Sequence, residues 1–293
     1  MFTATLIAGG GLAPGDISVG LDRLAAAGCA PAGSGWVEEG VAADLLFGLD
    51  ADAARSALEG AIPRTDVVVQ AVAFRRRRVL VADMDSTMIT VECIDELADY
   101  AGIKAEVAAV TERAMRGELD FDAALDARVA LLAGLDEAVV ERCLRERVRI
   151  TPGAVPLVRT MRGWGAPCLL VSGGFTRFAE PVAREIGFTA ARANVLEAEG
   201  GRLTGRVRRP ILGARAKEEA LLAACGEAGV GPEDALAVGD GANDLPMIRA
   251  AGLGVAYRAK PVVAAAAGAR IEHGDLSALL YAQGVPRREW VGA

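Results

Sequence analysis

Histidine is almost absent from this sequence, and its scarcity limits the chemistry open to the chain. The single histidine, His273, lies near the end in a Glu-His-Gly-Asp turn. A zinc site with two histidine ligands is therefore excluded, and we do not expect a catalytic triad built on histidine.

Paired cysteines are missing too. The five cysteines form no CxxC pair and show no metal-ligand spacing. We expect them to be small core residues in a reducing compartment. They are Cys29, Cys93, Cys143, Cys168 and Cys225.

Long apolar runs and an excess of basic charge are also lacking. The first residues contain no basic segment followed by a long apolar one, and no later apolar run approaches ~18 residues. The net charge is −7, which argues against a face that binds nucleic-acid phosphates. We therefore expect a cytoplasmic protein that binds neither nucleic acid nor membranes.

Aromatic residues make up only 4% of the chain, whereas hydrophobic residues make up 52%. Such a core is built from Ala, Val and Leu, as in helices packed on a parallel sheet. With 293 residues, we expect two domains of ordinary size.

The stretch Val79–Ala82 is a strand candidate around which the rest of the chain is organised. Its four apolar residues predict a strand buried on both faces, and the carboxylates Asp83 and Asp85 follow at once. In open α/β sheets the ligand crevice lies beyond the carboxyl ends of the strands, so we expect both carboxylates on its floor. The alternative is an Asp-rich turn that caps a helix.

Residues 1–74 predict a small ferredoxin-like α/β domain, because strand, helix, extended segment, helix and strand follow one another. Gly9-Gly10-Gly11 and Pro14-Gly15 either let the backbone approach a small ligand or form a simple loop. The run Arg75–Arg78 is typical of a solvated domain junction, with a functional patch as the alternative.

Residues 91–150 contain four helical patterns and no strand. A helical insertion directly after the Asp83 strand predicts a cap that excludes water and selects the substrate. Met115 and Phe121 lie within these patterns, where packing is the simplest role.

Two further strand ends carry polar residues: Ser172 with Gly173, and Asp240 with Asn243 and Asp244. Parallel strands bring their ends to one rim, where Asp83, Asp240 and Asp244 would repel one another. Ligands that are all oxygen favour Mg²⁺ as the compensating cation.

A phosphate bound at this rim also needs donors. The Ser172 hydroxyl and the Gly173 amide lie at a strand-to-helix turn, which presents N–H groups to an anion. Lys217 is one of three lysines among 32 basic residues, which indicates a need for a compact point charge rather than an exposed helix lysine.

Four motifs in this order resemble those of the haloacid dehalogenase-like phosphatases. They are Asp-Met-Asp-Ser-Thr at 83–87, Val-Ser-Gly-Gly-Phe at 171–175, Lys217, and Gly-Asp-Gly-Ala-Asn-Asp at 239–244. The segments 92–96 and 112–121, with Arg128-Val129, resemble the branch of that family that acts on O-phospho-L-serine. The resemblance covers residues 79–283.

The resemblance implies an α/β fold, with a Rossmann-like parallel-sheet core at 75–90 and 151–293. A helical-bundle cap would occupy 91–150. Residues 1–74 lie outside the resemblance; N-terminal domains vary in this family, and some resemble ACT-like regulatory modules that bind amino acids, so a regulatory role is a hypothesis for this ferredoxin-like unit. The implied reaction hydrolyses O-phospho-L-serine to L-serine and phosphate, the last step of the phosphorylated route of serine biosynthesis.

The resemblance also implies residue roles. Asp83 would be the nucleophile that forms an aspartyl-phosphate, and Asp85 the general acid and base. Ser172, Gly173 and Lys217 would bind the phosphoryl group.

The metal and substrate ligands follow from the same resemblance. Mg²⁺ would be bound by Asp83, Asp240, Asp244 and the main-chain oxygen of Asp85, with Asn243 in support of the phosphoryl ligands. In the cap, Glu92 would bind the ammonium of phosphoserine and Arg128 its carboxylate. Taken alone, each of these two is an ordinary surface charge. Met115 and Phe121 would wall the pocket.

Several alternatives stay open from the sequence. The substrate could be another small phosphomonoester, or the phosphoryl group of phosphoserine could pass to a second alcohol. A signalling receiver could store a phosphoryl group on Asp83, although Asp85 and a cap argue against it. L-Serine as a regulator at residues 1–74, and a homodimer, are further hypotheses.

Overall fold

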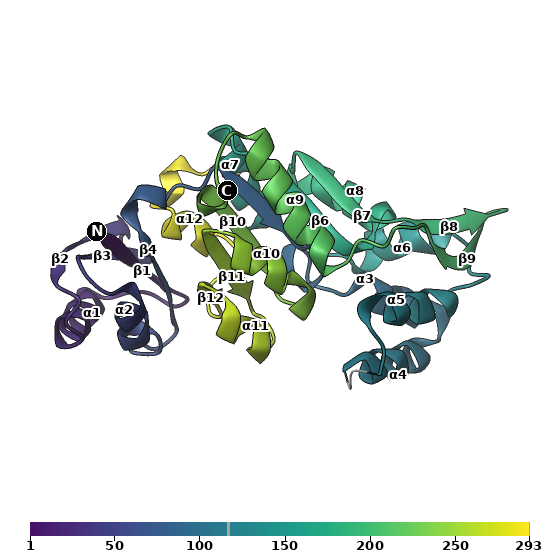
Figure 1. The fold of residues 1–293 in the computed structure, drawn as a ribbon, viewed down its shortest axis with the longest axis horizontal. Helices are drawn as coiled ribbons and strands as arrows, with labels where there is room; N and C mark the ends of the chain where they lie inside the picture. Colours follow the sequence, from purple (N-terminus) through teal and green to yellow (C-terminus); the bar gives the residue numbers. More distant parts are fainter. Residues whose placement is uncertain (116–117, 293) are drawn as a thin grey trace.

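The computed structural model describes residues 1–115 and 118–292, without the side chains of Ala114 and Met115. Three parts follow one another along the longest axis of the molecule (Figure 1). An N-terminal unit lies at one end, a six-stranded sheet with its helices lies in the middle, and most of the cap lies at the other end.

The N-terminal unit is a four-stranded antiparallel sheet in the order β2-β3-β1-β4, with two helices. Its elements are β1 (Phe2–Ala8), α1 (Pro14–Ala26), β2 (Pro31–Glu38), β3 (Ala42–Phe47), α2 (Ala51–Leu58) and β4 (Thr65–Ala71). This arrangement confirms the small ferredoxin-like unit. The segment predicted as one extended stretch is the hairpin β2–β3.

The central sheet is parallel throughout, in the order β12-β11-β10-β5-β6-β7. Its strands are β5 (Val79–Ala82), β6 (Cys168–Phe175), β7 (Ala190–Asn194), β10 (Ala235–Gly239), β11 (Leu253–Tyr257) and β12 (Ala269–Ile271). The parallel sheet and the place of the Asp83 strand within it are confirmed. Strand β7 was not predicted, because Ala-Ala-Arg-Ala-Asn has little β propensity and forms an exposed sheet edge.

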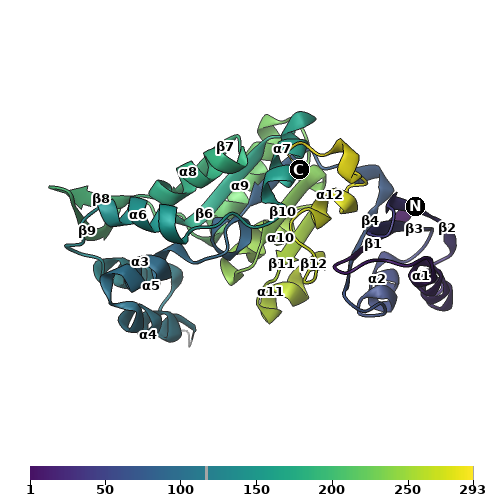
Figure 2. The ribbon, with the colours of Figure 1, turned by 180° about the vertical axis from the view of Figure 1, so that it is seen from behind.

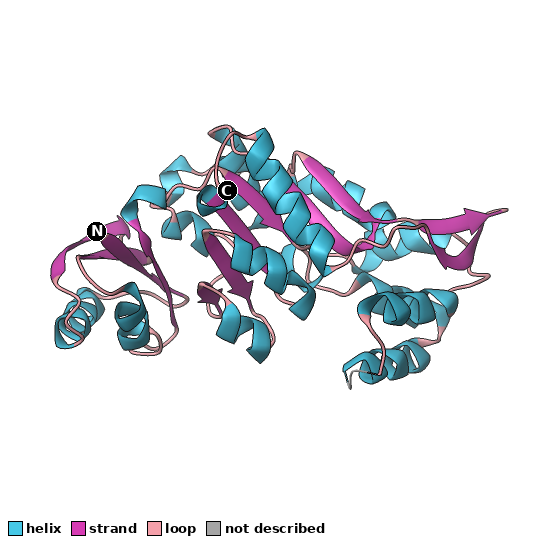
Figure 3. Ribbon diagram, in the orientation of Figure 1, coloured by secondary structure: helices cyan, strands magenta, loops and turns pink. Residues whose placement is uncertain are grey.

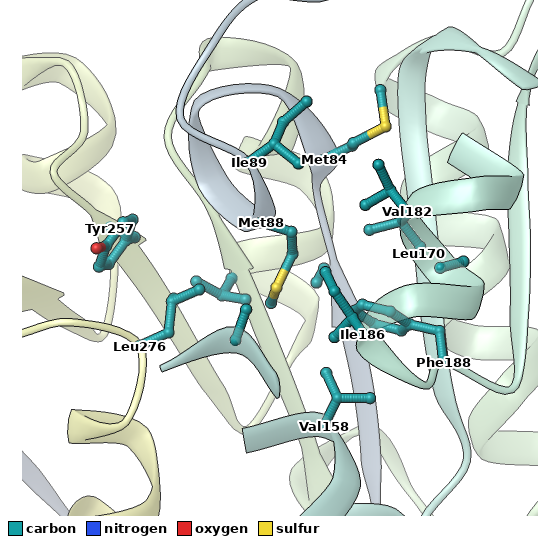
Figure 4. Packing of buried hydrophobic residues seen from close by; sticks show 14 of the residues in the cluster. Met84, Met88, Ile89, Val158, Leu170, Val182, Ile186, Phe188, Tyr257 and Leu276 are labelled. Atoms are coloured by element: carbon teal, nitrogen blue, oxygen red, sulfur yellow. The ribbon is translucent and has the colours of Figure 1, made fainter. Parts of the chain in front are cut away.

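Strand β5 is buried on both faces, as its apolar run predicts. Leu80 and Ala82 pack on one side with α7, α8 and α12, whereas Val79 and Val81 pack on the other with α9, α10 and α11. Figure 4 shows Met84 and Met88, which follow β5, within the first of these clusters. The helices are α7 (Ala154–Gly163), α8 (Thr176–Ile186), α9 (Ala214–Glu227), α10 (Leu245–Ala250), α11 (Pro261–Ala266) and α12 (Ala278–Ala282).

The cap contains the four helices that the sequence predicts. They are α3 (Cys93–Ala101), α4 (Lys104–Met115), α5 (Phe121–Ala130) and α6 (Ala138–Arg147). The two chain segments that connect the cap to the core meet in an antiparallel bridge between Ile89 and Ile150. The predicted domain boundaries at 74/75, 90/91 and 150/151 fall between regular elements and stay predictions.

A hairpin of the core extends beside the cap, as the view from behind shows (Figure 2). It consists of β8 (Leu196–Glu199) and β9 (Arg202–Val207), and it turns at Gly200-Gly201. Figure 3 shows it projecting from the sheet next to α5, which β9 contacts.

Among the described residues, no helix is both long enough and apolar enough to cross a membrane.

The arginine run at 75–78 is not uniformly solvated, so that expectation is wrong for two of its members. Arg75 forms an ion pair with Asp44 at 2.6 Å and donates to the carbonyl oxygen of Ala282 at 3.0 Å. Arg77 is only 2% exposed and donates to the Glu233 carbonyl and to Gln70 Oε1. Acceptors on both sides of the junction stabilise these two guanidinium groups, while Arg76 and Arg78 are exposed.

The glycine run at the end of β1 lies against the core. A Cβ atom on Gly9 would come within 2.9 Å of the His273 carbonyl oxygen. The missing side chain therefore allows two backbones from different parts of the chain to pack closely.

Asp66 joins the N-terminal unit to the loop after β12. Its buried carboxylate accepts N–H bonds from Glu272 at 2.9 Å, His273 at 3.1 Å and Gly274 at 2.7 Å. We expect Asp66→Ala to lower the free energy of unfolding by about 2–3 kcal/mol, because three backbone donors lose a charged acceptor. Urea unfolding checks this, with Asp22→Ala on the exposed face of α1 as the control. Equal stability of the two variants would contradict it.

Candidate active site

The polar ends of β5, β6 and β10 meet at the carboxyl edge of the sheet, as parallel pairing requires. The N–H of Asp83 donates to the Val238 carbonyl at 3.0 Å, so the first residue after β5 is fixed to β10. Helix α9 then places Lys217 between these strand ends.

Lys217 lies between two carboxylates in the interior. Its Nζ is 2.5 Å from Asp83 Oδ1 and 2.6 Å from Asp244 Oδ1. Lys217 and Asp244 are 0% exposed, and Asp83 is 6% exposed. Burial works to lower the pKa of Lys217, but Asp83 and Asp244 outweigh it and raise the pKa, so the ammonium stays charged.

The carboxylates outnumber this single ammonium. Asp83, Asp240 and Asp244 can each offer one ligand oxygen, and these atoms lie within 4.8 Å of one another. Burial, and then the Asp244 charge, raise the pKa of Asp83 well above its usual value, and burial raises the pKa of Asp240 to about 6. A cluster of oxygen donors with surplus negative charge fits a hard divalent cation such as Mg²⁺.

Asp244 is itself fixed by backbone donors. Its Oδ2 accepts the N–H of Asp240 at 3.1 Å and that of Gly241 at 3.0 Å. Asp240 Oδ1 accepts the hydroxyl of Thr87 at 2.9 Å. The ligand oxygens are therefore held in place by the protein itself.

Asp85 lies where the core meets the cap, and its side chain is not part of the acidic cluster of Asp83, Asp240 and Asp244. Its Oδ1 accepts the N–H of Cys93, the first residue of α3, at 3.1 Å. Burial, and then the nearby Glu92, raise the pKa of Asp85 to about 7. A carboxyl group at this position can hold and release a proton near neutral pH.

The loop at the end of β6 provides hydrogen-bond groups. The buried Ser172 Oγ accepts the N–H of Gly174 at 2.8 Å, which leaves its own proton to be donated. A Cβ atom on Gly174 would come within 2.7 Å of Asp85 Oδ2, so a side chain there would displace this carboxylate.

Phe121, the first residue of the cap helix α5, packs against that loop. A Cβ on Gly173 would come within 3.0 Å of the Phe121 ring, and one on Gly213, just before α9, within 3.3 Å. The amide nitrogen of Asn243 lies on the same side, 3.9 Å from that Gly173 position. Phe121 thus packs against the site as well as against the core.

Glu92 lies directly before α3 and Arg128 lies on α5, so the cap carries two opposite charges there. The Ser86 hydroxyl donates to Glu92 Oε1 at 2.7 Å, from a backbone with φ of 54°. Arg128 is half-buried and donates to the Ala124 carbonyl at 3.2 Å. Burial lowers its pKa, whereas the carboxylates of Asp95, Glu92 and Asp85 oppose that shift, so these groups lie within electrostatic reach of one another.

The structure therefore brings together nearly all of the predicted residues. Their roles stay predictions. Met115 ends α4, but its side chain lies outside the described part of the structure, as do Arg116 and Gly117 of the cap segment.

Sequence reasoning missed some residues at this site, among them Thr87 and Gly174. Thr87 orients Asp240, and Gly174 makes room for Asp85. Thr87 lies in the motif at 83–87 and Gly174 in the motif at 171–175. An expectation that these two motifs pack closely could have identified both residues.

Comparisons with known proteins agree with this geometry. The family model described as haloacid dehalogenase-like hydrolase matches residues 80–249. A phosphoserine phosphatase of Polaromonas sp. is 50% identical over 208 residues, which cover 69% of this chain and 88% of that protein. A phosphoserine phosphatase of Streptomyces coelicolor is 46% identical over 248 residues, or 83% of this chain. The match spans only 60% of the length of the Streptomyces protein.

A solved structure is similar over nearly the whole chain. A probable phosphoserine phosphatase from Vibrio cholerae, in its unliganded form, superposes with a TM-score of 0.75 at 32% identity. The match covers 96% of this chain and 88% of the Vibrio chain.

The acidic cluster predicts stabilisation by Mg²⁺. At a free concentration about 100 times Kd, binding to the folded state adds about 2.7 kcal/mol, which raises Tm. Asp240→Asn removes one charged ligand and should reduce this rise, whereas Asp22→Asn on α1 should keep it. Thermal unfolding with and without MgCl₂ measures the effect. An undiminished rise in Asp240→Asn would place the ion elsewhere.

Proposed function

Because this chain belongs to the haloacid dehalogenase-like hydrolases, we propose that it hydrolyses O-phospho-L-serine to L-serine and phosphate through an aspartyl-phosphate on Asp83. One observation carries this proposal. Asp83, Lys217 and Asp244 form a buried charged group at the carboxyl edge of the sheet, and the carboxylates of Glu92 and Asp85 act on the half-buried Arg128 of the cap.

In the first step a carboxylate oxygen of Asp83 attacks phosphorus, and the bond from phosphorus to the serine oxygen breaks. Asp85 gives its proton to the departing oxygen, so L-serine leaves as an alcohol. Asp85, now a carboxylate, takes a proton from a water molecule that attacks phosphorus. Phosphate leaves and the Asp83 carboxylate is restored.

Lys217 has two tasks in this scheme. It orients the Asp83 carboxylate through the 2.5 Å contact, and its charge stabilises the transferring phosphoryl group together with Ser172 and Gly173. Asp83, Asp240, Asp244 and the main-chain oxygen of Asp85 would bind Mg²⁺, with Asn243 in support. When bound, the ion supplies positive charge for the phosphoryl oxygens.

Recognition of the serine part belongs to the cap. Glu92, held by Ser86, would bind the ammonium, and Arg128 can bind the carboxylate through two parallel hydrogen bonds. Phe121 covers Gly173 and excludes water from the phosphoryl group.

Two alternatives use the same nucleophile. Another small phosphomonoester, or a second alcohol as acceptor, would keep Asp83 and Asp85 but change the cap contacts. A receiver that stores a phosphoryl group is disfavoured, because Asp85 lies beside the loop at Gly174, where it can activate water.

We also propose a cytoplasmic location. The five cysteines are free and buried, which supports a reducing compartment and hence the cytoplasm. L-Serine as a regulator bound to residues 1–74, and a homodimer, remain hypotheses. Constant activity across an L-serine titration of the full chain would remove the first, and a monomer by light scattering the second.

The central test is phosphate release from O-phospho-L-serine with Mg²⁺. We expect release to stop with EDTA and in Asp83→Asn, and to be slower from phosphothreonine and from sugar phosphates. No release from phosphoserine, with metal-dependent release from another ester, would retain the Asp83 mechanism and overturn the substrate.

Arg128→Gln tests recognition of the carboxylate. Loss of a charged pair of hydrogen bonds should raise KM for phosphoserine about 10- to 100-fold, with a smaller change in kcat. Phosphoethanolamine has no carboxylate, so its hydrolysis should change little. Arg142→Gln, at an exposed position of α6, is the matched control. A similar loss with both substrates would contradict the assignment.

A further inference from the structure

Asn194 links two segments that the proposed mechanism needs at a fixed separation. It is the last residue of β7 and is 3% exposed. Its Nδ2 donates to the Gly173 carbonyl at 2.9 Å and to the Leu212 carbonyl at 3.2 Å. Its Oδ1 accepts the N–H of Leu212 at 2.7 Å. One amide group therefore satisfies three backbone groups.

The pairing of β6 with β7 explains why Gly173 needs this partner. Val171 pairs with Arg192 and Phe175 with Asn194, so residues 172–174 of β6 lie opposite Ala193 alone. The surplus residues bulge out of the ladder and form the loop with the Ser172 hydroxyl and the Gly173 amide. The Gly173 carbonyl then takes its hydrogen bond from a side chain.

Leu212 is the other anchored segment. It lies in a stretch without regular structure between β9 and α9, directly before Gly213, which precedes the first residue of α9. The N–H of Lys217 bonds back to the Gly213 carbonyl at 3.4 Å. Asn194 thus fixes the start of the helix turn that carries the Lys217 ammonium.

Both anchored segments also touch the same cap residue. Positions for a Cβ on Gly173 and on Gly213 lie 3.0 Å and 3.3 Å from the Phe121 ring. A change in the spacing between the two segments would therefore alter the packing of the Phe121 ring as well as the phosphoryl site.

We propose that Asn194 is a positioning residue that sets the distance between the phosphate-binding loop and the Lys217 helix; this inference rests on the proposed function. The loop and Lys217 contact the phosphoryl group from two different segments, and the Asn194 amide holds those segments together. A displacement of about 1 Å in such a site costs on the order of 100-fold in rate.

The test compares Asn194→Ala with Leu196→Ala in the full chain with Mg²⁺. Leu196 is buried two residues further on and touches neither segment through a hydrogen bond, so its variant measures loss of packing alone. Assays well below each Tm give kcat and KM for phosphoserine, and calorimetry gives Kd for inorganic phosphate.

We expect Asn194→Ala to lower kcat about 10- to 100-fold and to weaken binding of inorganic phosphate, whereas Leu196→Ala keeps both near wild type. Asn194→Asp should behave like Asn194→Ala, because it keeps the acceptor for Leu212 but loses both donors. If Asn194→Ala does not fold, Asn194→Ser gives the same comparison.

Unchanged kcat and phosphate affinity in a folded Asn194 variant would overturn the inference, as would equal losses in Leu196→Ala. An assay of the wild-type protein distinguishes failure of this inference from a wrong assignment of the substrate. If it releases phosphate from p-nitrophenyl phosphate but not from phosphoserine, the proposed function fails, and the variants are then compared with p-nitrophenyl phosphate.

Discussion

The site depends on one buried ammonium placed between two carboxylates. Lys217, from α9, contacts Asp83 after β5 and Asp244 after β10, so three elements distant in sequence meet at one charged group. Removing one partner from a buried pair typically costs about 3–5 kcal/mol, since the remaining charge stays unpaired. An apolar core would be easier to stabilise, so the cluster is best explained by its chemistry. With the third carboxylate, Asp240, the cluster carries more negative than positive charge, and a bound cation would balance it.

The residues proposed for proton transfer and for substrate choice lie in one short stretch of chain. Asp85 accepts a hydrogen bond from the first residue of α3, and Ser86 bonds to Glu92, directly before that helix. Ser86 adopts a left-handed backbone, which costs energy for a residue with a side chain and is tolerated where the surroundings fix it. The proposed proton-transfer group and the predicted ammonium ligand are therefore both hydrogen-bonded at the base of the cap.

Local patterns predicted the helices and strands, and the rule for parallel strands predicted that their polar ends share one edge of the sheet. The apolar run before Asp83 predicted β5, and the spacing of apolar residues in the cap predicted four helices. Each of these patterns lies within one short segment of chain. Asn194 and Arg77 were missed, since their roles arise only between distant segments. Asn194 bonds to backbone groups 18 and 21 residues away, and Arg77 to a carbonyl 156 residues away. Asn194 stands in no pattern that distinguishes it from other polar side chains, and Arg77 lies in an arginine run whose other members are less buried.

The junction with the N-terminal unit constrains any regulation by that unit. Asp66 binds the loop after β12, and Arg77 binds the Glu233 carbonyl just before β10. Strand β10 then runs to Gly239, next to the metal-ligand candidates Asp240 and Asp244. The cap lies at the opposite end of the molecule (Figure 1). A ligand on the N-terminal unit would therefore affect catalysis through the position of β10 and its carboxylates.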